Sequence, residues 1–120
     1  NEFAILTDEI SRAWSGMTTR EYKDLKGLKK ENLRDNMSTT EIILNMLAET
    51  ATKDISARMN PETFTESRKV AKRGGSIAGN ARRELEEELG ESVITSKNAT
   101  QLNTIVTELI EATAEEGELS

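Results

Sequence analysis

Hydrophobic residues recur every three or four positions along most of this chain, which is the spacing of amphipathic helices. The first series contains Phe3, Leu6, Ile10 and Trp14. It ends near Ser15-Gly16, where glycine can adopt the left-handed conformation that closes a helix. The pattern therefore predicts a helix at the beginning of the chain, with one apolar face.

Capping boxes of the form Ser/Thr-x-x-Glu mark further helix starts. Thr18-Thr19-Arg20-Glu21 predicts a short helix that ends at Gly27. Residues 28–37 are expected to form a second short helix or turn. Ser38-Thr39-Thr40-Glu41 predicts a longer helix, which stops before Asn60-Pro61 because the residue before proline is disfavoured in helical conformation.

The helix expected after the second capping box is the most apolar part of the chain, over more than one stripe of its circumference. Such a helix is typical of a core element buried on several sides. Beyond Pro61 we expect a helix from about Thr65 to Leu89, an extended segment over residues 92–97, and a last helix that begins at Asn98. The predicted core residues of the central and last helices are Ile43, Leu47, Ala51, Leu102, Ile105, Val106 and Leu109.

The chain has 120 residues and a single proline, Pro61. This length suits one domain, and the near-absence of helix breakers favours an all-α fold. We expect a compact multi-helix domain of about five to seven helices over residues 1–114, followed by an acidic, frayed tail over residues 115–120. Because the chain begins with Asn1 and not with methionine, we expect it to be a fragment of a longer protein.

The composition excludes several kinds of chemistry. The chain has no cysteine and no histidine, so thiol nucleophiles, Ser-His-Asp triads and zinc sites built from these residues are impossible. The glutamates at 86–88 diverge by about 100° each on a helix and form no acid–base pair. We expect no enzyme, no cofactor, no metal and no small-molecule substrate. A cytoplasmic location is expected from the absence of disulfides, and no apolar run approaches the roughly 18 residues of a membrane span.

The charges are distributed unevenly along the chain. The net charge of −6 argues against a protein whose whole surface binds nucleic acid. Residues 20–34 mix basic and acidic side chains, as a solvated helix surface does, whereas residues 67–83 hold six basic residues and no acidic one. One-sided positive charge is what phosphate contact requires. The candidate nucleic-acid-binding residues are Lys26, Lys29, Lys30, Arg34, Arg68, Lys69, Lys72, Arg73, Arg82 and Arg83.

The glycine-rich stretch Lys72–Arg83 has two interpretations. In the first, Gly74 and Gly75 open a loop and Ser76 begins a helix whose N-terminal amides hold a phosphate. In the second, the helix is continuous, and small residues at every fourth position, including Gly75 and Gly79, let another helix approach closely. We favour the second interpretation, with Gly75 and Gly79 at an interface within the chain or across a dimer.

Four segments of the chain also resemble the C-terminal region of the DNA damage-inducible protein D family. They are Trp14-Ser15-Gly16-Met17, Glu21-Tyr22-Lys23, the Lys26–Met37 block (KGLKKENLRDNM) and Ser38-Thr39-Thr40-Glu41-Ile42. The resemblance spans roughly residues 3–98, and its most specific part is the Lys26–Glu41 block. It implies the C-terminal domain of a longer protein of the bacterial DNA-damage (SOS) response, a family also met in prophages. It brings no catalytic residues.

Two functions remain open from the sequence. The first is a non-enzymatic regulator that binds DNA or a recombinase–DNA filament. The alternative is a purely protein–protein or dimerisation module of a phage antirepressor-like protein, with a homodimer as one form. Salt dependence separates them, since phosphate binding weakens steeply as salt rises.

Overall fold

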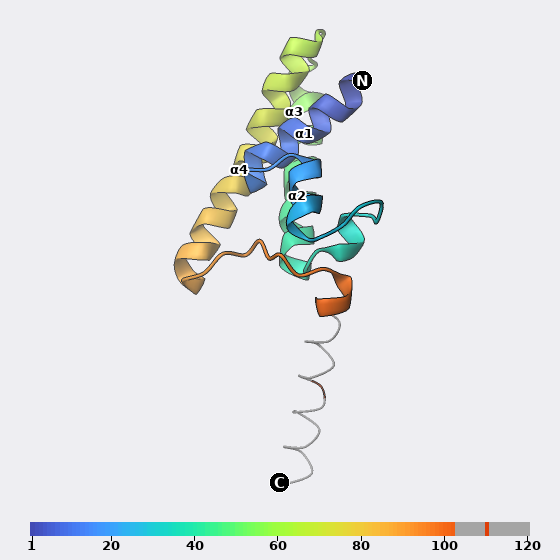
Figure 1. The fold of residues 1–120 in the computed structure, drawn as a ribbon. Helices are drawn as coiled ribbons and strands as arrows, with labels where there is room; N and C mark the ends of the chain where they lie inside the picture. Colours follow the sequence, from blue (N-terminus) through green and yellow to red (C-terminus); the bar gives the residue numbers. More distant parts are fainter. Residues whose placement is uncertain (103–109, 111–120) are drawn as a thin grey trace.

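The computed structural model describes residues 1–102 and Ile110, and within this part the chain is all-α and contains no strand (Figure 1). Its elements are α1 (Glu2–Ser15), α2 (Thr19–Leu25), the 3₁₀ helix η1 (Arg34–Asn36), α3 (Thr39–Met59) and α4 (Phe64–Leu89). The prediction of an all-α, multi-helix domain is confirmed. None of the described helices is long and apolar enough to cross a membrane.

The helix ends follow the capping signals in the sequence. The side chains of Thr18 and Ser38 accept hydrogen bonds from the backbone N–H groups of Glu21 and Glu41, and both capping boxes are complete. Helix α3 ends at Asn60, whose φ of 48° lies in the left-handed region. The predicted boundaries of α1, α2, α3 and α4 are therefore confirmed to within a residue or two, the usual ambiguity of a helix end.

Helices α3 and α4 run antiparallel and pack against each other, and α1 lies across both (Figure 1). Helix α4 is unbroken through its glycines. A Cβ atom on Gly74 would lie 2.6 Å from the Cα of Thr52 in α3. On Gly75 it would lie 2.5 Å from the Cβ of Ala13 in α1. The glycines therefore permit the close approach of two helices, and the phosphate-loop interpretation is wrong because no helix begins at Ser76.

The core lies where α1, α2, α3 and α4 meet. Its buried members are Trp14, Tyr22, Met37, Leu44, Ala48, Ala78 and Val93. The indole Nε1–H of Trp14 donates to Asn45 Oδ1 at 3.2 Å, so this large side chain is buried with its polar group satisfied. Val93 reaches the core from the segment that follows α4, which crosses to the beginning of α3 (Figure 1).

The predicted core of α3 needs correction. Ile43 is 59% exposed and Leu47 is 37% exposed, and the buried apolar residues of this helix are Leu44 and Ala48. The reason is that α1 and α4 cover one side of α3, so an apolar pattern over much of the circumference does not bury all of it. Ala51 and Leu102 are partly buried. The other predicted core residues, Ile105, Val106 and Leu109, lie outside the described residues.

Candidate nucleic-acid interface on helix α4

The small residues of α4 face inward and leave its opposite side free. The buried residues of this helix are Val70, Ala71, Gly74, Gly75, Ala78 and Gly79. On the other side, exposed polar residues recur at helical spacing and form what we call the α4 basic face: Lys69, Lys72, Arg73, Ser76, Asn80 and Arg83. No acidic residue lies between Glu66 and Glu84. The α4 basic face is thus a strip of unopposed positive charge.

Most cations of this face have no acidic partner. Among the described residues, no carboxylate lies within 4.0 Å of Lys69, Arg73 or Arg83. Arg83 donates to the side-chain oxygen of Asn80. Lys72 approaches Glu9 only at 4.0 Å, the limit of an ion pair, and its side chain stays exposed. These groups are therefore available to an anionic ligand.

Arg68 is committed to the fold, although its side chain is partly exposed. Its Nη2 donates to Glu9 Oε1 at 2.6 Å, which ties α4 to α1. The hydrogen bond from Arg68 holds the pKa of the buried Glu9 carboxyl below its ordinary value. Arg68 was predicted to contact nucleic acid, but in the structure its guanidinium group pairs with Glu9.

Arg82 is also committed to the fold. Its Nη1 donates to the backbone oxygens of Trp14 at 3.3 Å and Ser15 at 2.9 Å, so it satisfies carbonyls at the end of α1. Its Nε donates to Glu86 at 3.0 Å. Partial burial raises the pKa of Glu86, but hydrogen bonds from the Val93 N–H and from Arg82 outweigh it and leave that pKa below its ordinary value. These contacts within the fold argue against the prediction that Arg82 contacts nucleic acid.

Lys26 is buried completely, and its prediction as a phosphate contact is also wrong. Its Nζ donates to Glu41 Oε1 at 3.0 Å and to the backbone oxygens of Thr95 at 2.8 Å and Lys97 at 2.7 Å. The hydroxyl of Tyr22 donates to the other oxygen of Glu41. Burial and then this hydrogen bond raise the pKa of Tyr22. We call Tyr22, Lys26 and Glu41 the Lys26 cluster; it joins α2, α3 and the segment after α4.

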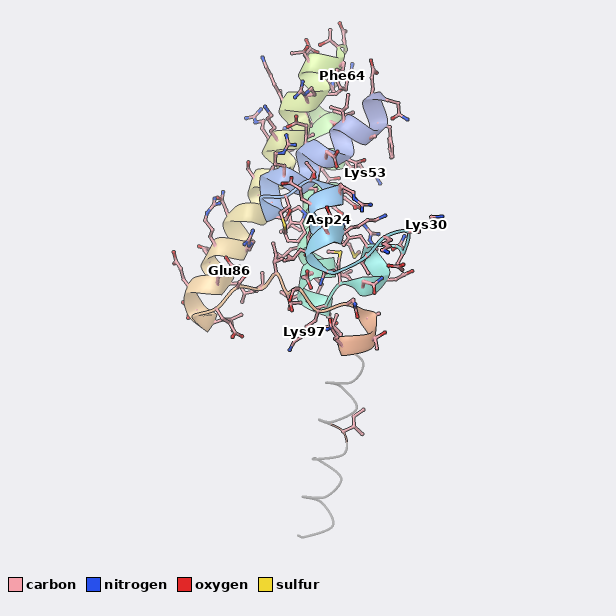
Figure 2. All side chains as sticks on the ribbon, viewed as in Figure 1. Asp24, Lys30, Lys53, Phe64, Glu86 and Lys97 are labelled. Carbon is pink, nitrogen blue, oxygen red and sulfur yellow. The ribbon has the colours of Figure 1, made fainter. Side chains whose placement is uncertain are left out.

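The remaining basic candidates lie elsewhere on the surface. Lys29 and Lys30 are exposed on the turn before η1, and Arg34 in η1 pairs with Glu49 at 2.5 Å. Figure 2 shows Lys30 projecting on the side of the molecule away from α4, whose ends are marked by Phe64 and Glu86. The two basic runs of the sequence therefore do not converge on one surface.

The predicted interface glycines are internal. A Cβ on Gly79 would lie 2.8 Å from the backbone oxygen of Ala13, and Gly75 faces the same helix α1. Both residues are buried within the chain. The small-residue stripe is therefore an α4–α1 contact, and it offers no surface to a second copy.

Three residues near the basic face were not in the set of candidate nucleic-acid-binding residues given above. Ser76 and Asn80 lie between its cations, and helical spacing alone places them there. Arg58 lines the same groove as Lys72 and Arg73, but it comes from the end of α3, so only tertiary packing places it there. The helical repeat of residues 69–83 is a local signal for the first two.

Comparisons of this chain with protein-family models, with characterised proteins and with solved structures found no match. The resemblance to the DNA damage-inducible protein D family therefore stays a prediction that depends on the residues quoted above.

Proposed function

We propose that this protein is a non-enzymatic regulator of the bacterial DNA-damage response that binds DNA, alone or within a recombinase–DNA complex, through the α4 basic face. The observation that carries this proposal is the positive strip on α4, where Lys69, Arg73 and Arg83 have no carboxylate within 4.0 Å in the described part of the chain and Lys72 is at the 4.0 Å limit from Glu9. The resemblance to the DNA damage-inducible protein D family supports the part of the proposal that places the protein in the bacterial DNA-damage response. The acidic remainder of the chain is compatible with binding through one limited face.

The dimensions of the face suit duplex DNA. Lys69 and Arg83 are separated by about 21 Å along the helix axis, at the ordinary rise of an α-helix. The major groove of B-DNA is about 12 Å wide and admits one helix. Cations at the two ends of the strip would then contact phosphates on both walls of the groove. Ser76 and Asn80, between them, carry the donors and acceptors that recognise base edges.

The acidic residues at both ends limit the contact. Glu66 precedes the basic face and Glu84 follows it, so phosphates beyond these positions would be repelled. Few phosphates are therefore engaged by a single copy. We expect binding that is weak for one copy and strongly dependent on salt.

A titration of duplex DNA with matched charge variants tests the proposal. Replacing Lys69, Arg73 and Arg83 together with glutamine should weaken binding by at least about tenfold, because each removed cation was contacting a phosphate. The control replaces Lys29, Lys30 and Lys53, which are also exposed but lie outside the face, and changes the net charge equally. Equal losses in the two variants would mean that binding follows net charge and not the α4 basic face.

A second candidate is a protein-binding module, favoured by the exposed apolar side chains of α3. Ile43, Met46 and Leu47 are all exposed in the described structure. In this case a recombinase filament would be recognised through apolar contact, and its binding would change little between low and moderate salt. Replacing Ile43 and Leu47 with serine would weaken filament binding and leave binding to free DNA unchanged.

A further inference from the structure

An open groove lies between the second half of α3 and the middle of α4. Its volume is about 810 Å³. The apolar residues that line it are Ile55 and Met59 from α3 and Ile77 from α4. Ile77 is 45% exposed and Met59 is more than half exposed. This groove, which we call the α3/α4 groove, therefore presents apolar surface that no described part of the chain covers.

The charged residues that line the groove are mostly basic. Arg58, Lys72 and Arg73 line it, against the single acidic residue Asp54. The Nη1 of Arg73 has one weak partner, the sulfur of Met59 at 3.8 Å. A complementary occupant is therefore a segment with apolar residues on one side and acidic residues around them.

The C-terminal part of this chain has that composition. All 16 basic residues lie at or before Lys97, and five of the 22 acidic residues lie beyond residue 102, so residues 103–120 carry −5 of the net charge of −6. From position 102 onward, apolar residues recur at positions i, i+3, i+4, i+7 and i+8, which is the pattern of an amphipathic helix. They are Leu102, Ile105, Val106, Leu109 and Ile110. Of these, Leu102 and Ile110 are described and both are helical; Leu102 is partly buried and Ile110 is 64% exposed.

The starting point of this segment favours the groove of another copy. Ala99 N–H donates to Asn36 Oδ1 at 2.9 Å, which fixes the segment near the beginning of α3. The groove lies near the other end of α3, a helix about 30 Å long at the ordinary rise. Figure 1 shows residues 98–102 at the end of α3 remote from its junction with α4. The sequence of residues 98–116 contains no glycine or proline, the residues that most strongly favour turns.

We propose that the α3/α4 groove binds the C-terminal segment, residues 103–118, of a second copy of this chain. The apolar residues of the segment cover Ile55, Met59 and Ile77, and its glutamates pair with Arg58, Lys72 and Arg73. Reciprocal exchange of the two segments gives a closed dimer with two equivalent contacts. This docking needs no nucleic acid and does not rest on the proposed function.

Cysteine cross-linking between separately tagged copies tests the proposal directly, because the natural chain has no cysteine. The Ile77→Cys variant of the 120-residue chain is mixed with the Leu109→Cys variant and treated with a short bifunctional thiol reagent. Docking brings the two thiols together, so the cross-linked heterodimer should form in about tenfold higher yield than with a control pair. The control mixes Leu25→Cys with Leu109→Cys, since Leu25 on α2 is 42% exposed and closely matches Ile77. The mixtures contain no nucleic acid, because it would compete for Lys72 and Arg73.

Three outcomes would overturn the proposal. Equal yields from Ile77→Cys and Leu25→Cys would show that the groove has no preference for the segment. Predominant Leu109–Leu109 cross-links would show that the segments pair with each other. A cross-link within single copies of the double variant Ile77→Cys/Leu109→Cys, independent of concentration, would place the segment in its own groove.

A charge exchange tests the ionic part of the contact without disturbing the core. Replacing exposed Arg58 and Arg73 with glutamate should lower the Ile77–Leu109 yield severalfold. Replacing Glu108 and Glu111 with arginine on the partner copy should then restore it, since the signs are complementary again. A yield that falls and is not restored would contradict charge complementarity as the basis of docking.

Discussion

The Lys26 ammonium group has three hydrogens and three acceptors in the described structure, one carboxylate oxygen and two backbone carbonyls. Its side chain and that of Glu41 are both 0% exposed. The two carbonyls belong to Thr95 and Lys97, 69 and 71 positions away in sequence. A charge pair in the core thus fixes the path of the chain after α4.

We expect Lys26→Met to destabilise the fold by about 3–5 kcal/mol, because it leaves the Glu41 carboxylate buried without its cation. The control is Lys29→Met, at an exposed position three residues away, which should change stability by less than about 0.5 kcal/mol. Urea unfolding of both variants measures the difference. Similar unfolding free energies for the two would contradict the structural role of Lys26.

Glu9 predicts how stability depends on pH. In the folded state, the hydrogen bond from Arg68 lowers the pKa of Glu9 from its ordinary value of 4.5. As the pH falls below about 4.5, the Glu9 carboxyl is therefore protonated in the unfolded chain before it is protonated in the folded one. The stability that this group contributes is fully present above that pH. It is lost as the pH drops through the folded-state pKa. Glu9→Gln should flatten the dependence of the unfolding free energy on pH between about 5 and 3. The exposed Glu84→Gln serves as the control, and the same flattening in both would contradict this assignment.

At the scale of the helices, the glycines of α4 determine how closely it packs against its neighbours. Gly74 faces α3, and Gly75 and Gly79 face α1, so the helix lies close to two neighbours at once. The same inward stripe leaves Lys69, Arg73 and Arg83 on the outside. The close packing and the candidate interface are therefore two consequences of one sequence pattern.

We expect Gly75→Ala to destabilise the protein by about 1–3 kcal/mol, although alanine is the better helix former, because the new Cβ would meet Ala13 and the backbone of Ile10. The neighbouring Ser76→Ala is the control, since Ser76 is exposed and the substitution should be neutral or slightly stabilising. Thermal unfolding compares the two. A Gly75→Ala variant as stable as Ser76→Ala would mean that α1 and α4 are not in close contact there.

The helices could be predicted because their signals are local. Capping boxes at Thr18 and Ser38 and left-handed C-caps at Gly16 and Gly90 depend on neighbouring residues only. The buried arc of α3 could not be predicted in this way. Its sequence is apolar over much of its circumference, and only the positions of α1 and α4 decide which part is covered.

The candidate site could be predicted in part. The basic run of residues 67–83 indicated that a nucleic-acid interface would lie on α4. The helical repeat also places Arg82 on a different side of the helix from the outward-facing cations. The burial of Lys26 could not be predicted, because its partners Glu41, Thr95 and Lys97 come from distant parts of the chain. Lys26 lies next to Gly27 in a basic run, and such a sequence is typical of solvent-exposed lysines. Only the tertiary contacts show that it is buried.

For the whole molecule, the distribution of charge matters more than its sum. The α4 basic face lies on a chain whose net charge is −6, most of it in the last 18 residues. A surface of this kind attracts phosphate over a limited area and repels it elsewhere. The central claim is therefore that a small number of defined cations on α4 contact nucleic acid.

The salt dependence of duplex DNA binding tests that claim most directly. If Lys69, Lys72, Arg73 and Arg83 each contact one phosphate, the logarithm of the association constant should fall with the logarithm of salt concentration with a slope of about −3.6. Arg73→Gln should bring this slope to about −2.7, whereas Lys30→Gln, on the side away from α4, should leave it unchanged. A slope near zero, or equal changes in the slope for the two variants, would contradict the assignment of the α4 basic face as the nucleic-acid interface.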